Sequence, residues 1–264
     1  MQTLADPTGC PRGEQPGPAI LSGMQQGTED EGGSTSLPLS EAMESAMYHL
    51  RDDVYRRPLA TALGRLGIEE GWRCVDVGAG GGDVSVALAE VVGRSGRVYA
   101  VDSDPARRDE VAAAAASHAQ VLAITQAAED LLLPETVDLS FCRFLLLHVR
   151  DPLVALDRMI RATRPGGWVV AQEPITSAGR VDGRPLSMPG ARWPDVGAVL
   201  PALAKQVGLD VVDAWAEAPA GAGPGPIARY LEALTGVDPG DDAVVLPPLV
   251  TVVARAPVPV SSQA

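Results

Sequence analysis

Val75-Asp76-Val77-Gly78-Ala79-Gly80-Gly81-Gly82-Asp83 is the stretch that decides the fold. It ends an apolar run at Arg73–Val77, which predicts a strand, and it opens a segment at Asp83–Val92 whose apolar residues recur at helical spacing. Glycines permit backbone angles that other residues avoid, and they let a ligand approach the main chain closely. A glycine-rich turn between a strand and a helix therefore predicts a ligand site at the carboxyl end of that strand.

The alternation of strands and helices continues beyond this turn. Apolar runs predict seven strands, at Arg73–Val77, Arg97–Val101, Val121–Thr125, Val137–Cys142, Trp168–Glu173, Val211–Ala216 and Leu249–Ala254. Helical spacing predicts helices at Asp83–Val92 and Val196–Val207, and the cap-and-proline pairs Asp104-Pro105 and Asp151-Pro152 begin two more. Such a chain is expected to form an α/β fold, with a mostly parallel seven-stranded sheet and helices on both faces.

The remaining segments differ in composition. Residues 1–38 are rich in Gly, Pro, Ser and acidic side chains, which predicts a disordered tail. Residues 39–69 carry apolar side chains at helical spacing that Pro58 interrupts, so we expect two short helices. They form either an N-terminal helical lid over the ligand site or a segment that simply packs on the sheet edge. Residues 70–258 are expected to form the α/β domain. Two Gly- and Pro-rich connections within it are expected to shape a substrate pocket: 174–194 and 219–245.

Composition and charge limit the classes of partner. The 264 residues carry a net charge of -13 and a single lysine, Lys205. Nucleic acids and anionic membranes are bound by clustered basic side chains, so we expect neither as a partner and favour a small-molecule substrate. Because Cys10, Cys74 and Cys142 form no CxxC pair, we expect no metal site and no disulfide framework, and we expect Cys74 and Cys142 to be buried.

Location and assembly leave weaker traces in the sequence. There is no apolar stretch of about 18 residues, as a membrane span would need. Residues 1–15 show no charged segment followed by an apolar one, so no secretion signal is visible. The cytoplasm is therefore the expected location, and a homodimer is left open.

A second informative feature lies at the end of the next strand. Asp102 follows Val98–Val101 and stands 20 residues after Gly82. A carboxylate at this place can accept hydrogen bonds from both hydroxyls of a ribose, so the two features together predict an adenosine-bearing ligand. Asp83 occupies the last glycine position of the dinucleotide pattern G-x-G-x-x-G, where its charge would repel a pyrophosphate. A ligand without phosphates is therefore favoured over NAD.

These motifs resemble those of a known family. The pattern D-x-G-x-G-x-G at Asp76–Gly82 resembles the first motif of class I S-adenosylmethionine-dependent methyltransferases. Leu131–Pro152 looks like the central segment of the small-molecule members, and Arg164–Gly167 resembles the turn that leads to their fifth strand. Residues 70–175 match the family pattern in order and spacing. The resemblance implies a Rossmann-like class I methyltransferase fold for 70–258, with S-adenosyl-L-methionine as the cofactor.

The resemblance also implies residues on the methionine side of the cofactor. Gly78, Gly80 and Gly82 would lie against its methionine and ribose portions. Asp76 would help to hold the methionine ammonium, often through water. Arg143, at the end of the fourth strand, would present its backbone carbonyl near the sulfonium.

On the adenosine side, Asp102 would bind the ribose hydroxyls and Ser103 would flank the adenine. The family often binds the adenine amino group with an acidic residue after the third strand, but Ala127 stands at that position here. Neighbouring residues are expected to supply the adenine contacts: Ala128, Glu129 and, as an alternative to Glu129, Asp130.

The chemistry of methyl transfer requires few side chains. It is an in-line displacement from a sulfonium, which needs alignment and exclusion of water, and a general base only if the acceptor must lose a proton. His148 is the best candidate base because it follows the fourth strand on the ligand side of the sheet; alternatively it packs beside the cofactor or caps a turn. His49 is a weaker candidate, and Glu173 either touches substrate or simply ends the fifth strand. The charged residues among 51–57 are interpreted as a solvated face without function.

The leading hypothesis is a methyltransferase that acts on a small molecule, such as a bacterial secondary metabolite. A second keeps the fold and the cofactor but assigns a non-methylating reaction, such as cyclisation, elimination or decarboxylation. A third is a non-catalytic binding protein, and a fourth is an NAD-dependent oxidoreductase, which Asp83 disfavours. Whether oxygen, nitrogen or carbon is methylated is not indicated by the residues.

Overall fold

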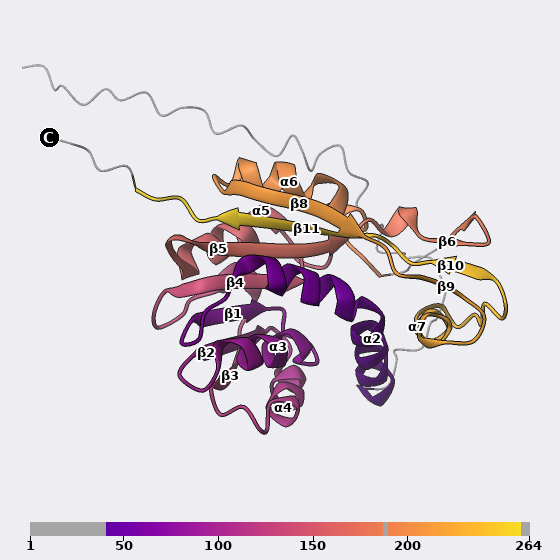
Figure 1. Cartoon of the computed structure of the whole chain (residues 1–264), viewed down its shortest axis with the longest axis horizontal. Helices are drawn as coiled ribbons and strands as arrows, with labels where there is room; N and C mark the ends of the chain where they lie inside the picture. The colour runs from indigo at the N-terminus through magenta and orange to yellow at the C-terminus, as the bar shows by residue number, and fades with distance from the viewer. Residues whose placement is uncertain (1–40, 187–189, 260–264) are drawn as a thin grey trace, which may run out of the picture.

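The computed structural model describes residues 41–186 and 190–259, and the predicted tail at 1–38 lies outside them. Its centre is a seven-stranded sheet with the strand order β3-β2-β1-β4-β5-β11-β8 (Figure 1). The strands are β1 (Arg73–Val77), β2 (Arg97–Asp102), β3 (Val121–Thr125), β4 (Val137–Arg143), β5 (Thr163–Pro174), β8 (Asp210–Glu217) and β11 (Leu249–Arg255). Neighbours among β1 to β5 are parallel, and β11 is antiparallel to both β5 and β8. The predicted fold class, a mostly parallel Rossmann-like sheet, is confirmed.

Helices cover both faces of this sheet. One face carries α2 (Glu41–Leu66), α3 (Asp83–Val92) and α4 (Pro105–Ala114), and the other carries α5 (Pro152–Ala162) and α6 (Val196–Gln206). Leu59 of α2 and Leu88 of α3 pack with Phe141 of β4 on the first face, whereas Leu156 and Leu200 belong to the core on the second. Because both faces are covered, β1 and β4 are buried along nearly their whole length and do not alternate between buried and exposed residues. Cys74 and Cys142, in two of these strands, are buried as expected.

A second, smaller sheet lies at one end of the molecule and was not predicted. Its order is β7-β6-β10-β9, and α7 (Pro226–Thr235) packs beside it (Figure 1). The strands are β6 (Arg180–Val181), β7 (Arg184–Pro185), β9 (Ala220–Ala222) and β10 (Ala243–Val245). Strands of two or three residues are too short to leave an alternating pattern in the sequence, so no strand is expected in either connection. A short helix that ends at Thr235 is expected, and α7 confirms it. Tyr55 of α2 and Tyr230 of α7 share a core with Leu246 beside this sheet.

The expected break at Pro58 is wrong, because α2 continues through this residue from Glu41 to Leu66. A proline inside a helix removes one backbone hydrogen bond and bends the helix, and Figure 1 shows two limbs of α2 that meet at an angle. Tertiary contacts stabilise the bent helix. The Pro58 carbonyl accepts a hydrogen bond from Gln172 Nε2 at 3.0 Å, and the Tyr55 hydroxyl donates to the Pro247 carbonyl at 3.1 Å.

Most other predicted elements agree with the structure to within one or two residues. The exception is β5, which begins at Thr163, five residues before the expected Trp168, and pairs with β4 across a register shift. Helix α6 continues through Pro201, as predicted.

Within the described ranges, no helix combines the length and the apolar character that a membrane crossing needs. The same part of the chain holds no group of three His, Cys, Asp or Glu residues placed to bind a metal.

Two glycines test how the packing around the sheet limits side-chain size. A Cβ on Gly197 in α6 would lie 2.4 Å from the Glu173 carbonyl oxygen, whereas a Cβ on Gly64 in α2 would meet nothing within 4 Å. We expect Gly197→Ala to destabilise the fold by about 2–3 kcal/mol, because backbone atoms must move. Gly64→Ala should stabilise it by about 0.5–1 kcal/mol through higher helix propensity. Thermal and urea unfolding measure both, and equal effects of the two substitutions would contradict the described packing.

Candidate active site

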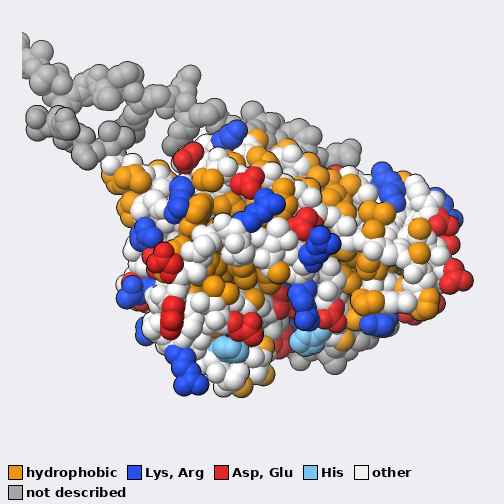
Figure 2. All heavy atoms as spheres, in the orientation of Figure 1, with side chains coloured by type: hydrophobic (Ala, Val, Ile, Leu, Met, Phe, Trp, Pro, Cys, Tyr) orange, Lys and Arg blue, Asp and Glu red, His pale blue; other side chains and the backbone are white. Residues whose placement is uncertain are grey.

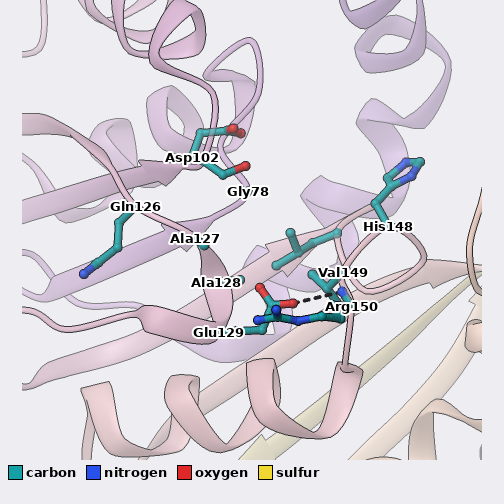
Figure 3. A pocket seen from close by; sticks show the side chains of 11 residues that line it. Gly78, Asp102, Gln126, Ala127, Ala128, Glu129, His148, Val149 and Arg150 are labelled. Atoms are coloured by element: carbon teal, nitrogen blue, oxygen red, sulfur yellow. Dashed lines mark hydrogen bonds between the residues drawn. The ribbon is translucent and has the colours of Figure 1, made fainter.

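A cavity of about 250 Å³ lies at the carboxyl ends of the parallel strands, where the loops after β1, β2, β3 and β4 meet (Figure 3). It is lined by Gly78, Asp102, Ser103, Gln126, Ala127, Ala128, Glu129, Leu145, His148, Val149 and Arg150. Parallel strands end at one edge of a sheet, and loops at this edge are the usual ligand-binding side of open α/β folds. Of the predicted site residues, the structure brings Gly78, Asp102, Ser103, Ala128, Glu129 and His148 together around this cavity. Asp76, Gly80, Gly82 and Arg143 do not line it.

The glycine loop is shaped by backbone conformation and by close packing. Gly78 has a φ of 77°, and a Cβ at this position would lie 2.8 Å from Leu145 Cδ1. The amides of Gly78 and Ala79 both donate to the Val101 carbonyl, at 2.7 and 3.0 Å, which joins the loop to β2. Gly82 has a φ of 87° and packs on α4, where a Cβ would lie 3.3 Å from Val111 Cα. Gly78 thus allows Leu145 to pack closely on the loop at the cavity, and Gly82 allows the start of α3 to pack closely on α4.

Asp102 is held in place by the loops on either side of it. Its Oδ2 accepts a hydrogen bond from the Gly80 amide at 2.9 Å, and its Oδ1 accepts one from the Asp104 amide at 3.0 Å. The residue is half-buried and lines the cavity. A carboxylate oxygen can accept two hydrogen bonds, so each oxygen keeps capacity for a ligand hydroxyl. This geometry suits recognition of a ribose.

The loop after β3 forms the adjoining wall. Ala127 and Ala128 present small side chains to the cavity, and Ala128 begins a short 3-10 turn. Glu129 Oε1 accepts a hydrogen bond from the Arg150 amide at 2.9 Å, which links this loop to the one after β4 (Figure 3). The Gln126 side chain points away from the cavity, and its Oε1 accepts from the Leu132 amide at 3.1 Å. The wall is therefore flat and largely apolar beside one carboxylate, which suits an adenine ring.

Asp76 lies beneath the glycine loop and is fully buried. Its Oδ2 accepts a hydrogen bond from the Ser85 hydroxyl at 2.6 Å. Burial raises the pKa of Asp76 to about 7, the Ser85 hydrogen bond opposes this, and the nearby charge of Asp83 adds to it. The carboxyl group thus supports the loop from below.

Arg143 uses its side chain in a way that the sequence did not predict. Its buried guanidinium donates to the Asp83 carboxylate and, at 2.9 Å, to Asp52 Oδ1. These contacts join β4 to α3 and to α2. Because Asp83 is paired with a cation, its charge at the start of α3 is neutralised. Asp83 therefore does not repel a pyrophosphate in the way that the sequence suggested.

The interpretation of residues 51–57 as a solvated face is wrong for two of them. The side chains of Arg51 and Asp52 are only 15 % and 14 % exposed. The Arg51 guanidinium lies 4.8 Å from the ring centre of Tyr48 and 5.0 Å from that of Phe144. It also approaches the glycine loop, since a Cβ on Gly80 would lie 3.9 Å from Arg51 Nη2. The one sequence signal for this burial is Arg143 itself, because a cation at the end of a buried strand needs carboxylates.

Arg51 offers a test of whether the site fits a cofactor with a carboxylate. Its Nε is buried and makes no hydrogen bond with the described residues, and Asp52 Oδ1 is 3.7 Å away. A buried donor of this kind is costly unless an acceptor completes it. An amino-acid carboxylate placed over Gly80 would supply the acceptor. A buried nitrogen without a hydrogen bond, on a guanidinium that approaches the glycine loop, thus fits the methionine end of S-adenosylmethionine.

His148 belongs to the turn after β4, and its imidazole extends away from Glu129 and Arg150 (Figure 3). The side chain reaches solvent, while the surrounding protein atoms and the charge of Arg51 lower its pKa. A neutral imidazole at pH 7 is able to accept a proton. His49 instead lines a separate hollow of about 410 Å³ between α2 and α3. Only His148 of these two candidates lies at the cavity of the strand ends.

The buried carboxyl group of Asp76 gives a pH-dependent test. Its folded pKa of about 7 exceeds the usual value of about 4, so the folded state binds more protons than the unfolded state between these pH values. The contribution of Asp76 protonation to the free energy of unfolding is therefore fully present below about pH 4 and is lost as the pH rises through 7. Asp76→Asn removes it and keeps an acceptor for Ser85, so the variant should gain about 3 kcal/mol relative to the wild type between pH 4.5 and pH 8.

Urea unfolding at the two pH values measures this difference. Asp157→Asn is a matched control, because Asp157 is a surface carboxylate that pairs with Arg161. The same pH dependence in the wild type and in Asp76→Asn would contradict the raised pKa.

Comparison with known proteins agrees with this geometry. Residues 75–171 match a family model described as a methyltransferase domain. A demethylmenaquinone methyltransferase from Geobacillus kaustophilus is 33 % identical over 126 residues, which cover 47 % of this chain and 50 % of that protein. The chain spans about half the length of the curated relatives it matches.

Solved structures share the fold at low sequence identity. A SAM-dependent methyltransferase from Aquifex aeolicus is 18 % identical with a TM-score of 0.58, covering 81 % of this chain and 98 % of that one. The [4+2]-cyclase SpnF is 17 % identical with a TM-score of 0.57, covering 82 % and 95 %. The glycine loop and the strand order agree with this match, and residues 75–171 are similar to a methyltransferase domain within a fold that solved methyltransferase structures share.

Proposed function

We propose that this protein transfers a methyl group from S-adenosylmethionine to a small-molecule acceptor. The observation that carries the proposal is the cavity at the strand ends, which Gly78 of the glycine loop lines and into which Asp102 presents an oriented carboxylate. The names of the curated relatives, demethylmenaquinone methyltransferases, support the same activity. When bound, the cofactor supplies an electrophilic methyl group on a sulfonium, and the protein must align the acceptor and exclude water.

Each part of the cofactor has a candidate partner. Asp102 would accept hydrogen bonds from the ribose hydroxyls, and Ser103, Ala128 and Glu129 would border the adenine. The Nε of Arg51, which makes no hydrogen bond with the described residues, would meet the methionine carboxylate. The glycines of the loop would lie against the methionine and ribose. Asp76 would act through the loop that it supports, and Arg143 would act by joining that loop to α2, the proposed lid helix.

His148 is the candidate general base. Its lowered pKa keeps the imidazole neutral at physiological pH, so a ring nitrogen can take a proton from an acceptor hydroxyl or amine. The alternative is that the ring only packs beside the cofactor. An acceptor that loses no proton would not need this group.

Several observations favour a small acceptor. The net charge is -13, and on the face seen in Figure 2 basic side chains are scattered among acidic and apolar ones without a continuous basic surface. Helix α2 packs on α7 and on the glycine loop, so the face beside the cavity is covered by protein. We extend the proposal to a bacterial secondary metabolite as the acceptor and to the cytoplasm as the place of the reaction.

A second candidate function has a specific observation in its favour. SpnF, whose name describes a [4+2]-cyclase, has the same fold. The site could bind S-adenosylmethionine and promote a reaction without transfer. Turnover of an acceptor with formation of S-adenosylhomocysteine supports the methyltransferase, and turnover without it supports this second candidate.

Asp102→Ala tests the cofactor site directly. Loss of a carboxylate that is hydrogen-bonded to the ribose should weaken S-adenosylhomocysteine binding by about 1–3 kcal/mol, measured by calorimetry. Asp157→Ala removes a surface carboxylate away from the cavity and should leave the affinity unchanged. Binding of NAD in place of S-adenosylmethionine by the wild type would overturn the proposal.

His148→Ala tests the role of the imidazole. If His148 is the general base, kcat should fall by about 10²-fold or more while the affinity for S-adenosylhomocysteine changes little. Steady-state kinetics with a methyl-accepting substrate and calorimetry separate the two effects. Equal, small changes in both quantities would assign the ring to packing.

A further inference from the structure

The carboxylate of Glu173 lies at the end of β5 and is completely buried. It faces neither solvent nor the cavity, so it is not the substrate contact considered from the sequence. Its Oε1 accepts hydrogen bonds from the amides of Leu145 at 2.9 Å and Leu146 at 2.8 Å, and its Oε2 accepts from Leu147 at 3.3 Å. One carboxylate thus anchors three consecutive amides of the loop that follows β4.

The first anchored residue, Leu145, lines the cavity, as do His148 and Val149 of the same turn. Leu145 covers Gly78, and its carbonyl accepts from the amide of His148 at 2.9 Å, which closes the turn 145–149. Phe144, just before the turn, has a φ of 53°, a conformation that a non-glycine residue keeps only when its surroundings impose it. The position of these lining residues therefore depends on what holds the turn.

The backbone of Glu173 is itself fixed. Its carbonyl oxygen lies so close to Gly197 of α6 that a Cβ there would come within 2.4 Å. At the other side of the turn, Trp193 donates from its backbone amide to the Leu147 carbonyl at 2.9 Å and from Nε1 to the Val149 carbonyl at 3.0 Å. The carboxylate is thus a rigid acceptor on one side of the turn, and Trp193 is a donor on the other.

An ionised carboxylate suits this place better than its neutral analogue. The three backbone amides of the turn are donors and need only acceptors, which both carboxylate oxygens supply. A glutamine would place its NH₂ group, also a donor, against one of these N–H groups. Burial raises the pKa of Glu173 to about 7, and the three amides and the charge of Arg51 oppose that rise. At pH 8.5 the group is ionised.

We propose that Glu173 is a positioning residue that fixes the turn 145–149, and with it Leu145 and His148, against the adenosyl cavity. The proposal rests on the proposed function for the identity of the ligand, but the contact between Glu173 and the turn is independent of it. Glu173 acts on the ligand only through the turn. Its loss should therefore loosen one segment and weaken binding, without general unfolding.

Glu173→Gln tests this at pH 8.5, with Glu135→Gln as the matched control. Glu135 accepts from the Tyr99 hydroxyl at 2.7 Å just before β4, at the opposite edge of the sheet from the cavity. In Glu173→Gln we expect amide hydrogen exchange of 144–149 to rise at least about tenfold and S-adenosylhomocysteine to bind about tenfold more weakly. Glu135→Gln should change neither quantity.

Two results would overturn the proposal: faster exchange spread over the whole sheet, or unchanged affinity despite a loosened turn. Glu173→Asp keeps the charge but shortens the reach, so it should give intermediate values in both measurements; it replaces Glu173→Gln if that variant does not fold. Failure of the wild type to bind S-adenosylhomocysteine would overturn the proposed function instead. In that case the exchange of 144–149 without ligand still decides whether Glu173 holds the turn.

Discussion

A single buried guanidinium joins the three elements that surround the glycine loop. Arg143 ends β4, and the carboxylates of Asp52 from α2 and Asp83 from α3 converge on it. A buried cation without partners is costly enough to unfold a domain, so β4 cannot end in this residue unless both helices lie where they do. Helix α2 and helix α3, which starts from the glycine loop, are therefore held by the same charge. The glycine loop precedes α3 and is approached by Arg51 of α2, so its surroundings depend on this contact.

Most of the carboxylates near that contact have hydrogen-bond donors as partners. Glu173 accepts three amides, Asp76 accepts the Ser85 hydroxyl, and Asp102 accepts two amides at the cavity rim. Arg51 differs, because its buried Nε lacks a hydrogen-bond partner among the described residues. A carboxylate-bearing ligand would complete the set. Binding would thus gain from a donor that folding leaves unpaired.

The part of the fold that matches the family model and the features particular to this chain lie in different segments. The stretch that matches the family model, 75–171, contains the strand ends and all the loops that line the cavity. Helix α2, helix α7 and the small second sheet lie outside this stretch and pack together around Tyr55 and Tyr230. Helix α2 also approaches the glycine loop, where a Cβ on Gly80 would lie 3.9 Å from Arg51 Nη2. The side chains that α2 brings to this loop therefore come from outside the matched stretch.

The sequence determined the sheet, its main helices and one half of the site, because these depend on local patterns. Apolar runs located the strands, the glycines located the turn, and Asp102 followed from its position at a strand end. Loops that follow neighbouring parallel strands must meet at one edge, so the residues lining the cavity were largely predictable. The sequence could not reveal the second sheet, whose strands are too short to show a period.

Only the tertiary structure decided the rest. Pro58 does not end α2, since contacts with Gln172 and Pro247 stabilise the bent helix against its local preference. Asp52 and Arg143 are 91 residues apart, and Glu173 is 26 to 28 residues from the amides it anchors. Such pairs leave no spacing signal, because their partners are chosen by where folding brings buried charges together. From the sequence alone, a charged residue is expected to face water. Only the packing shows that a protein partner has replaced the water around it.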